Sequence, residues 1–137
     1  MRFFQAMTIN TTALTAQRLR LDLIAANIAN ANTTRTPEGG PYRRKVPVFA
    51  ENLAAAGGAR PGGVRVVAVQ DDPAPFRRVY EPGHPDADQD GYVLYPNVNI
   101  INEMVNLMEA GRAYEANVTA FNAQKELFRA ALGIGRS

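Results

Sequence analysis

The N-terminal part of the chain carries a seven-residue repeat of apolar side chains. Between residues 6 and about 32 these side chains form one stripe, at Met7, Leu14, Leu21, Leu23, Ile24 and Ile28. This spacing brings the side chains to one face of an α-helix. We therefore expect a long amphipathic helix that packs against another helix through this stripe.

A second helix is predicted between residues 99 and about 132. Its apolar residues follow steps of mostly three or four positions, at Met104, Leu107, Met108, Tyr114, Val118, Phe121, Phe128 and Leu132. Such steps are typical of a helix in a coiled coil, and Asn99 is the expected N-cap. The seven-residue repeat of the first helix indicates a left-handed crossing for the pair.

The middle of the chain has a different pattern. All nine prolines lie between residues 37 and 96, which excludes long helices there. Clusters of β-branched and aromatic residues predict four short strands, at 42–49, 64–69, 76–80 and 92–95. The segment 50–63, which contains the run AAAGGARPGG, is expected to be a flexible loop because its residues are small and rich in glycine.

The lengths of the predicted helices decide the expected shape. A compact globule of 137 residues has a radius of gyration of about 14 Å and a diameter on the order of 37 Å. A helix over 99–132 is roughly 51 Å long, so such a globule cannot enclose it. The predicted fold is α+β, an elongated antiparallel coiled-coil pair of the N- and C-terminal helices with a small β-rich middle lobe. We expect residues 1–34 and 97–137 to form the two helices of this stalk, and residues 35–96 to form the lobe.

Composition narrows the classes of function. The net charge is +2, with 15 basic and 13 acidic residues, so no strong field favours nucleic acid or anionic lipid. There is no cysteine, which excludes disulfides, thiolate metal sites and a cysteine nucleophile. The start MRFFQAMTIN lacks the apolar region of a cleaved secretory signal, and no stretch is apolar for long enough to span a bilayer.

One motif raises the question of metal binding. DADQDG, at 86–91, matches the first six positions of a calcium-binding loop. The twelfth position is Asn97 instead of a bidentate glutamate, and Pro82 and Pro85 exclude an entering helix. We interpret the motif as a structural turn and predict no metal site and no cofactor.

Catalysis and nucleic-acid binding find little support. The only serine is Ser137, and His84 has no second histidine with which to bind a metal. His84 is interpreted as a turn residue. The basic clusters at 43–45 and 77–78 cannot all line one groove, because alternate residues of a strand face opposite sides. We therefore predict no enzymatic activity, no small-molecule substrate and no nucleic-acid partner.

Asparagine is the unusual component of the predicted helices. Ten of the eleven asparagines lie between residues 10 and 32 or between 97 and 122, although asparagine is a mediocre helix former. An amide costs less to desolvate than an ion, and it both donates and accepts hydrogen bonds. We interpret the helices as surfaces that other helices cover. Asn27 and Asn117 lie well inside the predicted helices, where a capping role does not explain them. For Asn30 and Asn32 the alternative of a helix stop stays open, because asparagine tolerates the left-handed conformation.

Four segments of the chain carry a family pattern: MRFFQAM, LTAQRLRLDLIAANIANANTTRTPEGGPYRRK, DPAPFRRVYEPGHPDADQDGYV and PNVNIINEMVNLMEAGRAYEANVTAFNAQK. Together they resemble the FlgC family of bacterial flagellar basal-body rod proteins over nearly the whole chain. NIANANT is typical of the wider class of flagellar rod, hook and hook-associated proteins. TRTPEGGPYRRK, PGHPDADQDGYV and RAYEANV indicate the FlgC type.

This resemblance implies a structural subunit of the proximal rod. Such proteins are exported by the flagellar type III apparatus without a cleaved signal, and they assemble helically around the export channel into the torque-transmitting shaft that crosses the periplasm. The implied partners are copies of the same chain, other rod proteins, and ring or export-gate components at the rod base.

The residues expected to act in this assembly form two groups. The first packs between helices, within a subunit or between subunits: Leu14, Leu21, Ile24, Ile28, Met104, Leu107, Tyr114, Val118, Phe121 and Phe128. The second belongs to the family motifs: Asn27, Asn30, Asn32, Arg112 and Asn117. The resemblance implies that Asn27, Asn30 and Asn32 belong to a helix end that neighbouring subunits cover. The first group could equally form the core of an ordinary helical hairpin. The asparagine-rich faces on the opposite sides of the helices favour assembly with other subunits instead.

Overall fold

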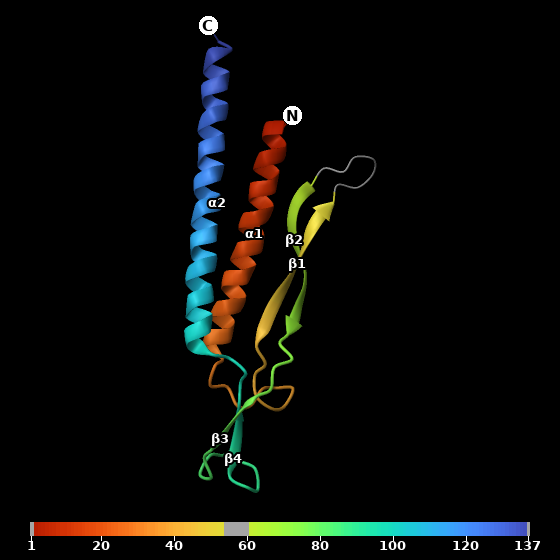
Figure 1. The fold of residues 1–137 in the computed structure, drawn as a ribbon, viewed down its shortest axis with the longest axis vertical. Coiled ribbons are helices and arrows are strands. Elements are labelled where there is room, and N and C mark those ends of the chain that lie inside the picture. Colours follow the sequence, from red (N-terminus) through yellow and green to blue (C-terminus); the bar gives the residue numbers. More distant parts are fainter. Residues whose placement is uncertain (1, 54–60, 137) are drawn as a thin grey trace.

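Two long antiparallel helices form the body of the protein. The computed structural model describes residues 2–53 and 61–136. Helix α1 (Arg2–Ala29) runs beside helix α2 (Ile100–Ile134) in the opposite direction (Figure 1). Phe3 at the start of α1 stacks on Phe128 near the end of α2, with ring centroids 4.9 Å apart. The predicted α+β fold with an elongated antiparallel helix pair is confirmed.

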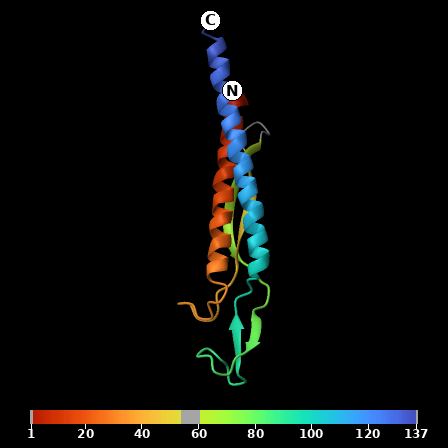
Figure 2. The same ribbon diagram turned by 90° about the vertical axis from the view of Figure 1, so that its left-hand side faces the viewer.

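The middle of the chain forms two separate hairpins. Strands β1 (Lys45–Leu53) and β2 (Pro61–Asp71) pair in antiparallel fashion and lie along α1, on the side away from α2 (Figures 1 and 2). Strands β3 (Arg77–Tyr80) and β4 (Tyr92–Tyr95) form a short antiparallel pair. This pair lies beyond the end of the helix pair at which α1 finishes and α2 begins, which we call the closed end (Figure 1). The sequence predicted the strands but not the division of the lobe.

The long hairpin extends further than expected into the segment 50–63. Residues 50–53 belong to β1 and residues 61–63 belong to β2, and residues 54–60 lie outside the described residues. The expectation of a flexible loop is therefore wrong for residues 50–53 and 61–63. Gly63 has φ of +99°, and a side chain there would overlap Thr12 Oγ1 on α1. Val64 N–H also donates to Thr12 Oγ1 at 3.2 Å, so Gly63 lets the hairpin approach the helix closely.

Gly63→Ala is expected to destabilise the fold by about 1–3 kcal/mol, because alanine is strained at this φ and its Cβ displaces Thr12. Urea denaturation of the purified chain measures the change. Gly83→Ala is the matched control, since Gly83 has open space around it and no positive φ. Equal stability of the two variants would show that the hairpin does not depend on this contact.

The hydrophobic core of the described chain is thin. Its buried apolar residues are Ala16, Ile24, Ala31, Val93 and Ala110. Many larger apolar side chains of α2 are more than half exposed, among them Met104, Met108 and Leu132. None of the helices among residues 2–53 and 61–136 has the length and apolar content to cross a membrane. The exposed apolar positions therefore lie on the helix pair without a covering element from the described chain.

Candidate functional site

Asn27 lies where the two helices and the long hairpin meet. Its side chain is in the last turns of α1 and is 1% exposed. Asn27 Nδ2 donates to the main-chain carbonyl of Lys45, and Asn27 Oδ1 accepts the main-chain N–H of Lys45, both at 2.9 Å. The Tyr42 hydroxyl donates to the same Oδ1 at 2.9 Å. The amide pairs with both polar groups of the first residue of β1, as a neighbouring strand would, and ties the hairpin to α1.

Glu103 brings a buried carboxylate from α2 to the same point. It lies in the first turn of α2 and is 1% exposed. Arg44 Nε donates to Glu103 Oε1, and Asn27 Nδ2 lies 3.5 Å from Glu103 Oε2. A carboxylate is buried at acceptable cost only when it is paired and hydrogen-bonded, and Glu103 is both. We call Asn27, Tyr42, Arg44, Lys45 and Glu103 the polar junction.

Arg44 forms ion pairs with two carboxylates, those of Glu103 and Asp72. Arg44 also donates to Asp72 Oδ2 at 3.0 Å. Burial lowers the pKa of Arg44, but the hydrogen bonds and charges of Glu103 and Asp72 outweigh it and leave this pKa above its ordinary value. The hydrogen bond from the Ala74 main-chain N–H is the main cause that lowers the pKa of Asp72 below its ordinary value. Arg44 and Asp72 therefore both stay charged at neutral pH, and Arg44 links Asp72, which directly follows β2, to Glu103 on α2.

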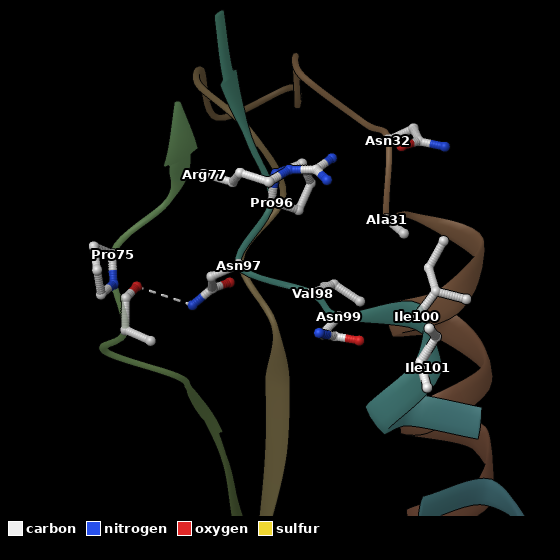
Figure 3. Close-up of a pocket in the computed structure, with 11 residues that line it drawn as sticks. Ala31, Asn32, Pro75, Arg77, Pro96, Asn97, Val98, Asn99, Ile100 and Ile101 are labelled. Carbon is white, nitrogen blue, oxygen red and sulfur yellow. Dashed lines mark hydrogen bonds between the residues drawn. The ribbon is translucent and has the colours of Figure 1, made fainter. Parts of the chain in front are cut away.

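An open pocket of about 500 Å³ lies beside the polar junction, between the end of α1, the start of α2 and the base of β3 (Figure 3). Asn97 lies in its wall and donates to the carbonyls of Asp72 and Ala74 at 3.1 and 3.0 Å. Its Oδ1 accepts the main-chain N–H of Arg44 at 2.8 Å. Among the described residues that line this pocket, Arg77 alone is ionisable. These described lining residues therefore provide no acid–base pair and no nucleophile.

The DADQDG segment forms a turn whose carboxylates are already engaged. Asp86 accepts the Thr34 hydroxyl at 2.7 Å and pairs with Arg35. Asp88 Oδ1 accepts the main-chain N–H groups of Asp90 and Tyr92 at 2.9 and 2.8 Å. The hydrogen bond from Thr34 is the main cause that lowers the pKa of Asp86, and the one from Tyr92 N–H does the same for Asp88. The contacts of Asp86 attach the turn to the loop that follows α1, and the hydrogen bonds of Asp88 hold the turn itself.

Calcium is expected not to bind this turn in the low-micromolar range, because the bidentate twelfth ligand is missing and Asp86 and Asp88 have protein partners. Isothermal titration of the chain with calcium chloride tests this expectation. Stoichiometric heat that disappears in an Asp86→Ala, Asp88→Ala double variant would contradict it.

The predicted turn and cap residues have local roles. Asn30 Nδ2 donates to the Ala26 carbonyl at 2.9 Å, and Asn30 Oδ1 accepts the Thr33 hydroxyl at 3.2 Å. Asn30 thus stops α1, which was the alternative left open for it. Asn99 is the N-cap of α2, as predicted, because its side chain accepts the Asn102 N–H. His84 Nδ1 accepts the Asp86 N–H at 3.0 Å and is a turn residue, as predicted.

The predicted packing residues divide between two sides of α2. Leu107, Tyr114, Val118 and Phe121 are half-buried, and Phe128 is 36% exposed but stacks on Phe3 of α1. Met104 is 52% exposed. On α1, Ile24 is buried, and Leu14, Leu21 and Ile28 are half-buried. Met104 therefore does not lie between α1 and α2 as a core residue of the hairpin would. A role for these residues in packing between subunits stays a prediction.

The remaining family-motif residues are spread over the helix pair. Asn117 is half-buried on α2, Arg112 is exposed on α2, and Asn32 is exposed beside the pocket of Figure 3. Asn27 alone among the motif residues joins the polar junction. The residues that cover it come from its own chain, which corrects the expectation that neighbouring subunits cover it.

Sequence reasoning missed the partners of Asn27. Glu103 stands in the first turn of α2, where glutamate is favoured by the helix dipole and is usually exposed. Tyr42 and Arg44 lie in the segment 42–49, for which the sequence predicts a strand. Nothing in that pattern distinguishes these two residues from other polar strand residues. The available signal was the interruption of an apolar stripe by Asn27, but its partners lie up to 76 residues away along the chain.

Two family models match the two ends of the chain. The model described as "Flagella basal body rod protein" matches residues 7–35, and the model described as "Flagellar basal body rod FlgEFG protein C-terminal" matches residues 89–134. These matches contain most of α1 and all of α2. Together with the elongated helix pair, they define the class of flagellar basal-body rod proteins.

Curated relatives narrow the class to one family. The chain is 44% identical to the flagellar basal-body rod protein FlgC of Borreliella burgdorferi, with 98% of each chain covered. It is 46% identical to FlgC of Yersinia enterocolitica and 40% identical to FlgC of Bacillus subtilis, with 99% of this chain and 100% of each relative covered. The chain belongs to the FlgC family of flagellar basal-body rod proteins. It is a structural rod protein and not an enzyme, as the sequence predicted.

Proposed function

We propose that this chain is a subunit of the proximal rod that assembles helically through α1 and α2 around the export channel. One observation carries the proposal: α2 packs only against α1 among the helices and strands of the described chain, and this packing leaves large apolar side chains of α2 exposed. Met104, Met108, Leu127 and Leu132 are each more than half exposed. Apolar area of this extent on an elongated protein marks a surface that a partner covers.

The outer face of α1 also suits contact with other helices. Thr8, Thr11 and Thr15 are exposed, and their hydroxyls donate to main-chain carbonyls one turn earlier, at 2.9 to 3.0 Å. A neighbouring helix therefore covers threonine methyl groups without leaving hydroxyl donors unpaired. Between Phe3 and Pro37 the chain has no lysine and no glutamate, so little charge must be desolvated.

The partners in this proposal are copies of the chain, other rod proteins, and ring or export-gate components at the rod base. The proposed location is the periplasmic part of the basal body, reached by the flagellar type III apparatus without a cleaved signal. Support for partners, location and export comes from family membership and from the apolar surfaces of α1 and α2.

Leu127→Asp is expected to abolish swimming, because Leu127 is 68% exposed in the single chain and a carboxylate on a surface that becomes buried is not solvated there. Soft-agar motility of a strain that carries only this variant measures the effect. The purified variant should keep its helix content by circular dichroism. Leu127→Met is the control and should swim normally, whereas normal swimming of Leu127→Asp would count against assembly through α2.

A further inference from the structure

The outer face of α2 carries a compact patch of large apolar side chains near the polar junction. Ile101 is 73% exposed, Met104 52%, Val105 53% and Met108 58%. Their spacing places them on one face of the helix, and the hairpin β1–β2 lies on the other side of α1 (Figure 1). We call these four residues the α2 patch.

Two charged residues continue this face towards the C-terminus. Arg112 and Glu115 follow Met108 at steps of four and three, and both are exposed. The exposed face of α1 carries Arg18 and Asp22 at a similar spacing, followed by the small residues Ala25 and Ala29. None of these four charged side chains takes part in an ion pair or a hydrogen bond within residues 2–53 and 61–136.

The contacts inside one chain give the heights of these residues along the stalk. Phe3 stacks on Phe128, Arg20 pairs with Glu109, and Asn27 lies beside Glu103. Residues of α1 and α2 thus lie at the same height when their numbers add up to about 130. A neighbouring copy in the same orientation, placed beside α2 without an axial shift, would set Arg112 opposite Arg18 and Met108 opposite Asp22. That arrangement opposes like charges and buries an aspartate on methionine.

A shift of three to four residues, roughly 4.5–6 Å along the helix axis, removes both conflicts at once. Arg112 then lies opposite Asp22, and Glu115 lies opposite Arg18. The same shift sets Met108 opposite Ala25, and Met104 and Val105 opposite Ala29, so that large side chains meet small ones. Large residues opposite small residues allow two helices to pack closely.

From this match of charge and size we propose that the α2 patch of one copy docks on the exposed face of α1, around Ala25 and Ala29, in a second copy of the chain. The proposal rests on the proposed function and names the partner and the register of one contact in it. The two faces differ, so the interface is heterologous. Repetition of such an interface with an axial shift generates an open helix instead of a closed dimer.

Cysteine cross-linking tests the register, because the chain has no cysteine of its own. Chains with Ala25→Cys and chains with Met108→Cys are expressed together in a flagellated strain that lacks the wild-type chain. Oxidation of isolated basal bodies should yield a disulfide-linked dimer of the two variants. Thr11→Cys combined with Met108→Cys is the control. Thr11 shares the exposed face of α1 but lies 14 residues, or about 21 Å, from Ala25, and this pair should yield no dimer.

Three cross-linking results would overturn the proposal: dimers from one single-cysteine variant alone, a disulfide to a different rod protein, or incorporation of both variants into rods without any dimer. In the last case the proposed function stands, because the chain is in the rod. Absence of the wild-type chain itself from the rod would instead refute the proposed function.

Charge exchange provides a second measurement that does not depend on cysteine. Asp22→Arg and Arg112→Asp should each cause loss of swimming, because each places like charges opposite one another. The double variant restores the opposite pair and should swim. Loss of swimming in the double variant, or normal swimming in both single variants, would overturn the register.

Discussion

Glu103→Ala is expected to destabilise the fold by about 3 kcal/mol. The substitution leaves the Arg44 guanidinium next to a buried cavity without its main partner, and removal of one member of a buried ion pair typically costs about 3–5 kcal/mol. We expect the low end of this range, because Arg44 keeps Asp72 and is partly exposed. Urea denaturation of the purified chain, followed by circular dichroism, measures the difference.

Glu109→Ala is the matched control for this experiment. Glu109 lies on the same helix and pairs with Arg20 at 3.7 Å, but its side chain is 68% exposed. Exposed ion pairs contribute less than about 1 kcal/mol, so the control should lie close to the wild type. Equal effects of the two substitutions would show that the polar junction does not stabilise the closed end of the stalk.

Asn27→Leu is expected to cost about 2–4 kcal/mol although leucine is of similar size and a better helix former. The leucine leaves the main-chain N–H and carbonyl of Lys45 and the Tyr42 hydroxyl without partners, and each unpaired buried group costs about 1–3 kcal/mol. The amide hydrogens at the start of β1 should also exchange faster with solvent, because the hairpin base is no longer held to α1.

Asn122→Leu separates this effect from the general consequence of an asparagine-to-leucine change in a helix. Asn122 is exposed on α2, and leucine has the higher helix propensity. Its stability should equal or slightly exceed that of the wild type. If Asn27→Leu behaves like Asn122→Leu, the hydrogen bonds of Asn27 do not matter for stability and the residue acts elsewhere.

The asparagine-rich end of α1 shows how far local reasoning reaches. Asn27 was recognised as an internal helix position where capping does not apply, and the structure confirms that it is buried. The covering groups were expected from neighbouring subunits, but they come from Tyr42, Lys45 and Glu103 of the same chain. Helical periodicity identifies which face of a helix is covered. It does not identify the covering partner, because contacts between distant segments depend on the path of the chain.

The same limit applies to the position of Met104 and Met108 on α2. Steps of three and four placed them in one stripe with Leu107, Tyr114 and Phe121. When apolar residues lie on two sides of a helix, their spacing does not show which side packs against the partner helix. In the structure the α1 side of α2 contains Glu103 and Ala110, which are buried, and the α2 patch faces away. Glutamate and alanine do not stand out as apolar positions in the sequence. The predicted packing face was therefore assigned to the larger methionines.

The sequence by itself determined the family, the α+β class, the two long helices and the short strands of the middle. These features depend on local pattern, on proline placement and on motifs that cover nearly the whole chain. Only the tertiary structure decided the course of the long hairpin along α1, the docking role of Gly63 and the members of the polar junction. The physical reason is that each of these contacts joins residues from 15 to 76 positions apart. Close approach, burial and pairing arise only when the fold brings such distant segments together. The pattern within one segment therefore does not predict them.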